Sequence, residues 1–200
     1  MYGSSHEDSQ LINRPDVLYY YNCDGSTFSD VGWGCVYRML QTLYTQVLGM
    51  PAPSLSHIQR TLAVSYTPMD SKQMWIEPVD IIRFFDASGV AVPQKLFLYF
   101  PNPADVVSQR TQMLMRRTSL QDAHCVYFNG EKLLSDLKET FRKHRYLVII
   151  DNGVMSYGIF GFRGCKLLVL DPHTTAEGRV VQEMDVSQFL RQFWMVLSTG

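Results

Sequence analysis

The chain has 200 residues, 46% of them hydrophobic, and its 18 Lys and Arg residues nearly balance 19 Asp and Glu residues. This length suits one domain with a buried core, and the apolar content excludes disorder along the whole chain. The net charge of −1 disfavours binding to nucleic acid or to a membrane surface, because both need a basic excess. No apolar run is long enough to span a membrane, and the polar N-terminus has no secretory signal, so a cytoplasmic protein is expected.

The order of predicted elements indicates the fold class. Residues 1–14 are polar and are expected to form a flexible tail, which leaves residues 15–200 as a single domain. Periodicity and caps predict helices at 35–48, after Ser54, from 77–78 to about 87, at 131–144 and at 185–192. Strands or extended segments are predicted at 17–22, 94–100, 146–151, 156–162, 165–171 and 193–198. Because helices dominate the first half and strands the second, an α+β domain with an antiparallel sheet is favoured over a βαβ fold.

The four cysteines do not form a metal-binding pattern. No two of Cys23, Cys35, Cys125 and Cys165 have C-x-x-C spacing, so a zinc site is not predicted, and no other metal or organic cofactor is implied. Cys125 and Cys165 lie in apolar runs and are expected in the core, while Cys23 is expected to be a bystander.

Cys35 differs from the others because it follows Gly32-Trp33-Gly34 and opens a helix. Unpaired backbone N–H groups and the positive end of the helix dipole stabilise a thiolate at that position. The glycines allow a substrate backbone to approach closely. A small buried residue that starts a core helix would have the same pattern, so this segment alone leaves both interpretations open.

A second segment, Asp171-Pro172-His173, ends an apolar strand. Residues two apart in an extended segment project to the same face, so Asp171 can hold one ring nitrogen of His173 while the other faces a nucleophile. A turn with an exposed histidine is the alternative. A cysteine at a helix start together with Asp-x-His at a strand end matches the papain-like cysteine hydrolases.

Longer stretches extend this similarity. Residues 30–42 (DVGWGCVYRMLQT) and 168–174 (LVLDPHT) resemble the two active-site segments of the ubiquitin-fold modifier 1-specific proteases. Residues 54–61 (SLSHIQRT) and 71–76 (SKQMWI) resemble further stretches of that family, in order. The similarity therefore covers most of residues 19–198.

The resemblance implies a papain-like domain in which N-terminal helices, including the nucleophile helix, pack on a mainly antiparallel C-terminal sheet. It implies that Cys35 is the nucleophile, His173 the general base and Asp171 the residue that orients it. The expected activity is a cysteine protease or isopeptidase that cleaves after the C-terminal glycine of a ubiquitin-like modifier, without a cofactor. Precursor maturation and removal from conjugates both stay open, as does the oligomeric state.

The resemblance also implies an upstream tyrosine whose hydroxyl forms the oxyanion hole together with the Cys35 N–H. Tyr21 is the best match, with Tyr19 and Tyr20 beside it.

Three further residues are expected to bind the modifier's tail, namely Trp33, Gly34 and Trp75, the last of which aligns with a tryptophan of the family's substrate channel. The chain departs from the family by a small insertion between Tyr21 and Cys35 and by one extra residue, Met74, beside Trp75. It also has residues 151–154 (DNGV) and 156–157 (SY) where the family commonly has Gly-Gly-Gly-Val and Ala-His.

Two kinds of alternative remain at this stage. The autophagin cysteine proteases, which act on ubiquitin-like autophagy modifiers, also carry a Gly-Trp-Gly-Cys segment, and residues 171–175 (DPHTT) match theirs slightly better. The longer chains of that family and residues 37–42 (YRMLQT) favour the first family instead. Outside enzymes, the chain could be an inactive binding module for a ubiquitin-like partner or a structural domain in which both motifs are coincidental.

Overall fold

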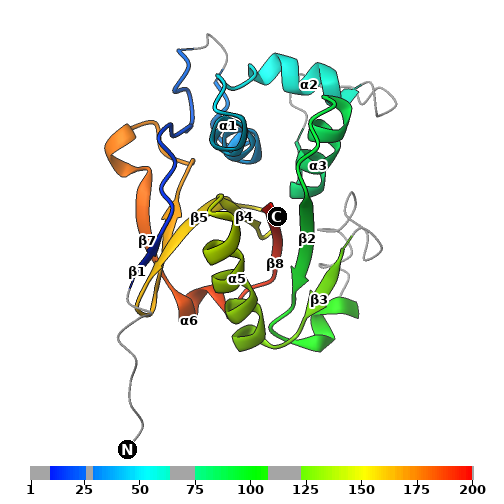
Figure 1. The fold of residues 1–200 in the computed structure, drawn as a ribbon, viewed down its shortest axis with the longest axis vertical. Coiled ribbons are helices and arrows are strands. Elements are labelled where there is room, and N and C mark those ends of the chain that lie inside the picture. Colours follow the sequence, from blue (N-terminus) through cyan, green and yellow to red (C-terminus); the bar gives the residue numbers. More distant parts are fainter. Residues whose placement is uncertain (1–9, 26–28, 64–74, 108–122, 200) are drawn as a thin grey trace, which may run out of the picture.

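The computed structural model describes residues 10–25, 29–63, 75–107 and 123–199, and its main feature is a large sheet flanked by helices (Figure 1). The eight strands have the order β3-β2-β8-β4-β5-β6-β7, with β1 pairing on β5. Among the described strands only β2 and β3 pair in parallel. The strands are β1 (Gln10–Ile12), β2 (Gln94–Tyr99), β3 (Cys125–Tyr127), β4 (Val148–Asp151), β5 (Ser156–Arg163), β6 (Lys166–Leu170), β7 (Val181–Asp185) and β8 (Trp194–Thr199).

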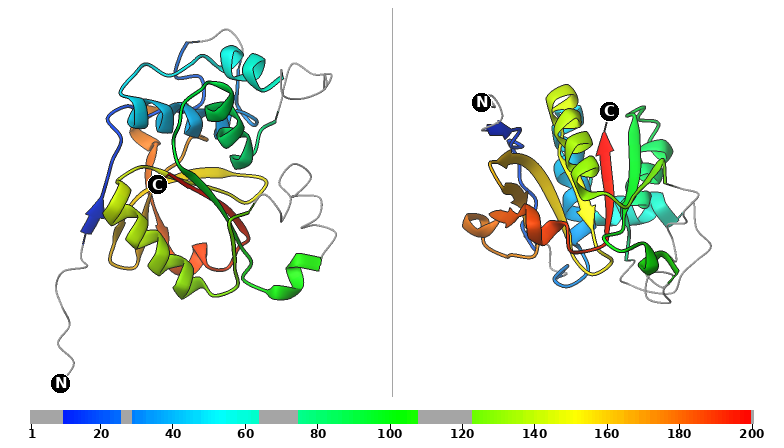
Figure 2. Two further views of the ribbon diagram at one scale, coloured as in Figure 1. Left: turned by 45° about the vertical axis from the view of Figure 1, so that its right-hand side comes forward. Right: turned by 90° about the horizontal axis from the view of Figure 1, so that it is seen from below.

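Helices cover both faces of this sheet (Figure 2). They are α1 (Cys35–Leu48), α2 (Leu55–Ala63), α3 (Pro78–Ala87), α5 (Gly130–His144) and α6 (Val186–Phe189), with 3-10 turns at Pro103–Val107 and Glu177–Arg179. The first three helices lie on one face and α5 lies on the other. Side chains alternate along β4 accordingly: Ile149 packs in the cluster under α1, whereas Val148 and Ile150 pack under α5. Two buried faces explain why the strand is apolar at every position before its last residue.

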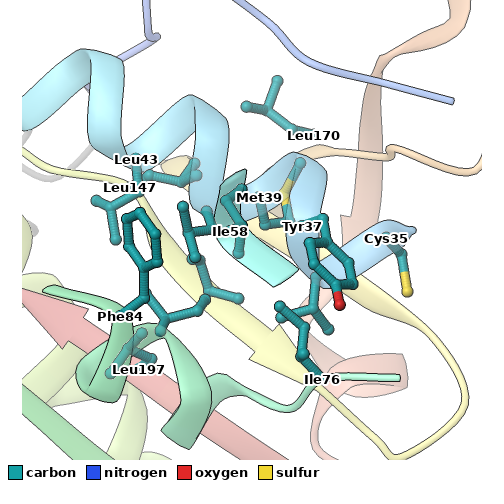
Figure 3. Close-up of a cluster of buried hydrophobic side chains, with 14 of the residues drawn as sticks. Cys35, Tyr37, Met39, Leu43, Ile58, Ile76, Phe84, Leu147, Leu170 and Leu197 are labelled. Atoms are coloured by element: carbon teal, nitrogen blue, oxygen red, sulfur yellow. The ribbon is translucent and has the colours of Figure 1, made fainter. Parts of the chain in front are cut away.

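The central helix of the first layer is α1, which Figure 3 shows crossing the cluster with Cys35 at its first turn. Its first nine residues, Cys35–Leu43, are all buried, including Arg38 and Gln41. The sequence pattern predicted one apolar face, so the burial of these polar side chains is a difference, and they hydrogen-bond to each other at 3.0 Å. The helix ends, as predicted, where Gly49 adopts φ 62°.

The structure confirms the α+β class, the mainly antiparallel sheet and the long predicted helices. Three short strands were not predicted. Residues 10–12, expected in a tail, form β1 on β5, and the edge strands β3 and β7 lack an alternating pattern. Residues 21–24 form a turn rather than a strand.

Two cysteine predictions were wrong: Cys125 and Cys165 are exposed, because Cys125 begins an edge strand and Cys165 follows the β5–β6 turn at Gly164. Residues 71–74 of the family-like stretch 71–76 lie outside the described residues, as do residues 1–9 of the predicted tail. In the described part of the chain, no helix has the length and apolar character that crossing a membrane requires.

Candidate active site

The nucleophile candidate Cys35 is the first residue of α1, and it is 1% exposed. Gly34 is the N-cap and supplies no side-chain hydrogen bond, so no cap competes for the first N–H groups of the helix. Gly32 adopts φ 85°, a left-handed conformation that favours glycine. Gly34 is constrained differently, because a Cβ atom there would lie 2.7 Å from the Asp30 Cβ. Both glycines are therefore required by the loop that delivers Cys35.

His173 and Asp171 follow β6 and are bonded to each other as the sequence predicted. The carboxylate Oδ1 of Asp171 lies 2.6 Å from the ring Nδ1 of His173 and accepts the His173 backbone N–H at 2.9 Å. Because both the ring and the backbone N–H of His173 are bonded to Asp171 Oδ1, the carboxylate fixes the orientation of the imidazole relative to the His173 backbone. The other ring nitrogen, Nε2, is buried and forms no hydrogen bond with another described residue, which leaves it for proton exchange.

The charges of Asp171 and Cys35 both act on the His173 imidazole. Burial is the largest influence on its imidazole and lowers the pKa, but the Asp171 carboxylate and the nearby Cys35 sulfur outweigh it and raise the pKa to about 9. Burial likewise opposes the charged form of Asp171, yet the hydrogen bonds from His173 hold its pKa below the ordinary value. At neutral pH the ring therefore carries a proton and the carboxylate does not.

Tyr21 is the tyrosine that the structure brings to this group. It is 3% exposed, and its ring meets the His173 ring edge-on at a centroid distance of 5.6 Å. Burial is the larger influence and the Cys35 sulfur the next, and both raise the pKa of the Tyr21 phenol. The hydroxyl therefore stays protonated and can donate a hydrogen bond. The neighbours Tyr19 and Tyr20 are half-buried and have no such contact with Cys35 or His173 among the described interactions.

The remaining predicted residues come from two different segments. Trp33 is half-buried on the nucleophile loop, where its ring packs edge-on against Tyr37 and its Nε1 donates to the Ser29 carbonyl at 3.0 Å. Trp75 precedes α3 and is 38% exposed. Trp33 and Gly34 are thus held next to Cys35 by the chain itself, whereas the position of Trp75 depends on the packing of the α3 segment.

Two residues at the site were not predicted. Gln182 on β7 donates from Nε2 to Asp171 Oδ2 at 2.8 Å, so it holds the carboxylate oxygen that His173 does not use. Tyr157 on β5 packs against His173 at a ring distance of 5.4 Å, so the imidazole contacts both Tyr157 and Tyr21. Burial, followed by the charges of Asp171 and Cys35, raises the Tyr157 pKa to about 12. Neither residue carries a local motif, because sheet pairing brings both of them to the site.

A third missed group is the buried carboxyl of Asp151, at the end of β4. It accepts hydrogen bonds from the Gly153 N–H at 2.5 Å and from the Ser156 hydroxyl, its partner across the β4–β5 pair. Burial raises its pKa to about 6, while the charge of His173 acts in the opposite direction. Asp151 and Ser156 both lie where the chain departs from the family's Gly-Gly-Gly-Val and Ala-His pattern. The two residues that differ from the pattern are thus hydrogen-bonded to each other.

No cluster of three or more His, Cys, Asp or Glu side chains suited to a metal ion occurs among the described residues. The arrangement of sulfur, imidazolium, carboxylate and phenol is instead that of a nucleophilic thiol site. Comparison with known families agrees with this chemistry. The profile of peptidase family C78 matches residues 7–194.

The chain belongs to peptidase family C78. Membership confirms the resemblance and the peptidase class inferred from the sequence. The crystal structure of UfSP from C. elegans matches with a TM-score of 0.62 and 19% sequence identity. The match covers 98% of this chain and 35% of that one, so this chain spans about a third of its length. This likeness confirms the papain-like fold. None of the curated proteins matches the chain.

Proposed function

We propose that this C78 peptidase cleaves after the C-terminal glycine of a ubiquitin-fold modifier, in precursors, in conjugates or in both. The observation that carries the proposal is the 2.6 Å hydrogen bond between Asp171 and Nδ1 of His173, which leaves the buried Nε2 without a hydrogen-bond partner among the described residues. The Cys35 sulfur contributes, together with Asp171, to the raised pKa of His173. Cys35 is buried, and the side chains of His173 and Asp171 are half-buried, with exposures of 18% and 14%. The likeness to UfSP from C. elegans, together with the family-like segments 30–42 and 168–174, supports the choice of modifier.

The first chemical step is attack by sulfur. His173 holds the proton of Cys35 as an imidazolium, which Asp171 stabilises, so the attacking sulfur is a thiolate. The thiolate then adds to the carbonyl carbon of the modifier's terminal glycine, and the carbonyl π electrons move to oxygen. His173 returns its proton to the departing amine as the C–N bond breaks. His173 then takes a proton from water, whose oxygen adds to the thioester carbonyl carbon. The C–S bond breaks, the modifier leaves with a free C-terminal carboxyl group, and the thiolate and imidazolium are restored.

The negative oxygen formed in that step needs hydrogen-bond donors that are already in place. The Tyr21 hydroxyl and the backbone N–H of Cys35 serve in this role. The raised pKa of Tyr21 supports it, because a phenol that stays protonated at all physiological pH values is always able to donate. No step requires a metal or an organic cofactor.

Binding of the modifier's tail is proposed for Trp33, Gly34 and Trp75. Gly34 joins Trp33 to Cys35, which places the backbone of this segment beside the sulfur, and the Trp33 ring packs edge-on against Tyr37. The exposed part of Trp75 offers apolar surface to such a peptide. The compartment proposed is the cytoplasm, since all four cysteines are thiols outside any disulfide, as a reducing environment maintains them.

The test offers the protein a panel of ubiquitin-like modifiers that each carry a C-terminal electrophile. We expect a covalent adduct with the ubiquitin-fold modifier and none when Cys35 is replaced by Ser. Faster labelling by an autophagy modifier would instead indicate an autophagin-type specificity. Absence of labelling by every modifier, with the protein folded, would indicate an inactive binding module.

A further inference from the structure

Arg38, within one helical turn of Cys35, forms a buried ion pair with Asp30. The Arg38 guanidinium, one turn after Cys35 on α1, donates from Nε to Asp30 Oδ2 at 2.6 Å, and both side chains are fully buried. Its Nη1 also donates to Asp24 at 3.1 Å. Burying two charges costs desolvation free energy that their attraction offsets only with good geometry, so such a pair is weak evidence for a purely stabilising role.

Asp30 connects the two segments that carry the sulfur and the phenol. Its Oδ1 accepts the backbone N–H of Asn22 at 2.7 Å, and its own N–H donates to Asn22 Oδ1 at 3.2 Å. Its carbonyl accepts the N–H groups of Gly34 at 2.8 Å and Trp33 at 3.2 Å. One residue is thus bonded to the neighbour of Tyr21 on one side and to the neighbour of Cys35 on the other.

The segment that Asp30 holds has little structure of its own. Residues 17–20 belong to no helix or strand, and residues 21–24 form a turn in which Asn22 adopts the left-handed φ of 59°. A non-glycine residue in that conformation needs support from its surroundings. Oxyanion donors act only when their placement is accurate to a fraction of an ångström, so the anchor of this turn sets how well Tyr21 works.

We propose that Asp30, oriented by Arg38, is a positioning residue that sets the Tyr21 hydroxyl against the carbonyl that Cys35 attacks. This inference rests on the proposed function. The residue acts through Tyr21 and does not touch the reacting atoms.

The experiment replaces Asp30 by Asn, which keeps the shape and removes the charge that faces Arg38. With a cleavable modifier fusion as substrate, we expect kcat to fall about 10- to 100-fold with KM changed less than about threefold. Alkylation of Cys35 by iodoacetamide, which forms no oxyanion, should keep its rate. In a Tyr21→Phe background the same substitution should change kcat less than about threefold, because the hydroxyl that it positions is absent.

Two further variants serve as a substitute and as a control. Asp30→Glu retains the charge but moves the carboxylate by one methylene, and it should lower kcat in the same Tyr21-dependent way if Asp30→Asn does not fold. Asp136→Asn removes a carboxylate bonded to Lys132 and Tyr127 on the α5 side and should leave kcat unchanged. Equal losses with and without the Tyr21 hydroxyl, or a parallel loss of alkylation, would overturn the inference. A wild-type protein that cleaves no modifier would instead refute the proposed function.

Discussion

Tyr21 donates its backbone N–H to the carbonyl of Pro172 at 3.0 Å. Pro172 stands between Asp171 and His173, so one hydrogen bond joins the segment that carries the phenol to the segment that carries the imidazole. The edge-on contact between the Tyr21 and His173 rings adds a second connection. The phenol of Tyr21 and the imidazole of His173 are therefore coupled, and a change in the position of one is expected to shift the other.

Removing the Tyr21 hydroxyl should weaken the oxyanion site while leaving the nucleophile intact. Tyr21→Phe keeps the ring contact with His173, and we expect kcat to fall about 10²- to 10³-fold, the usual effect of one lost oxyanion donor. The rate of Cys35 alkylation by a small reagent should be unchanged. Steady-state kinetics on a modifier fusion, run beside the alkylation assay, checks both. A Tyr21→Phe enzyme with wild-type kcat would show that another donor serves the oxyanion.

The pH dependence should report the pKa of His173. In the proposed mechanism the imidazolium protonates the departing amine, so activity should decline as the pH rises through about 9, the pKa at which the ring loses its proton. The Asp171 carboxylate raises that pKa, so Asp171→Asn should move the alkaline limb toward the ordinary value of about 6.5. A profile of kcat/KM against pH measures the shift. An alkaline limb at the same pH in both proteins would contradict the assignment of Asp171.

Tyr157 should contribute through its ring and not through its hydroxyl. The ring packs against His173 and Trp194, while the hydroxyl meets only the Met155 sulfur among its described hydrogen-bond partners. Tyr157→Phe should therefore keep kcat/KM within about threefold, and Tyr157→Ala should lower it about 10- to 100-fold by freeing the imidazole. The pair of variants is its own control, because equal losses would point to the hydroxyl instead.

The absence of a side chain at Gly34 should be required for the stability of the fold. A Cβ atom there would press on Asp30 in a filled space, so Gly34→Ala should destabilise the fold by about 1–3 kcal/mol. The matched control is Gly178→Ala, at an exposed position where a Cβ atom would meet nothing within 4 Å. Thermal unfolding of the two variants should show a drop in Tm of several degrees for the first alone.

The bond between Asp171 and His173 and the helix that begins at Cys35 could be predicted because each has a local chemical signature. Cys35 has its glycines and its helix start, and Asp171 and His173 are two apart on an extended segment. Gln182 could not be predicted, because it reaches Asp171 only through the β6–β7 pairing that sets Val169 opposite Gln182. Sheet register is a property of the whole fold, and β7 has no alternating pattern that would reveal it.

Local sequence patterns also cannot decide which of Tyr19, Tyr20 and Tyr21 lies at the site. Three tyrosines in a row present equivalent chemistry, and a strand at 17–22 would place alternate rings on opposite faces. The structure instead has a turn from residue 21, stabilised by the bonds between Asn22 and Asp30, and this turn directs Tyr21 inward. The deciding interaction joins residues eight positions apart, which periodicity does not detect.

Alkylation of Cys35 at about pH 6 tests most directly whether the His173 imidazole activates the sulfur. Iodoacetamide labelling, quantified on the peptide that contains Cys35, should be about 100-fold slower in His173→Gln than in the wild-type protein. Exposed Cys125 in the same molecule is the internal control and should react equally in both. Equal labelling of Cys35 in the two proteins would show that the imidazole does not activate the sulfur.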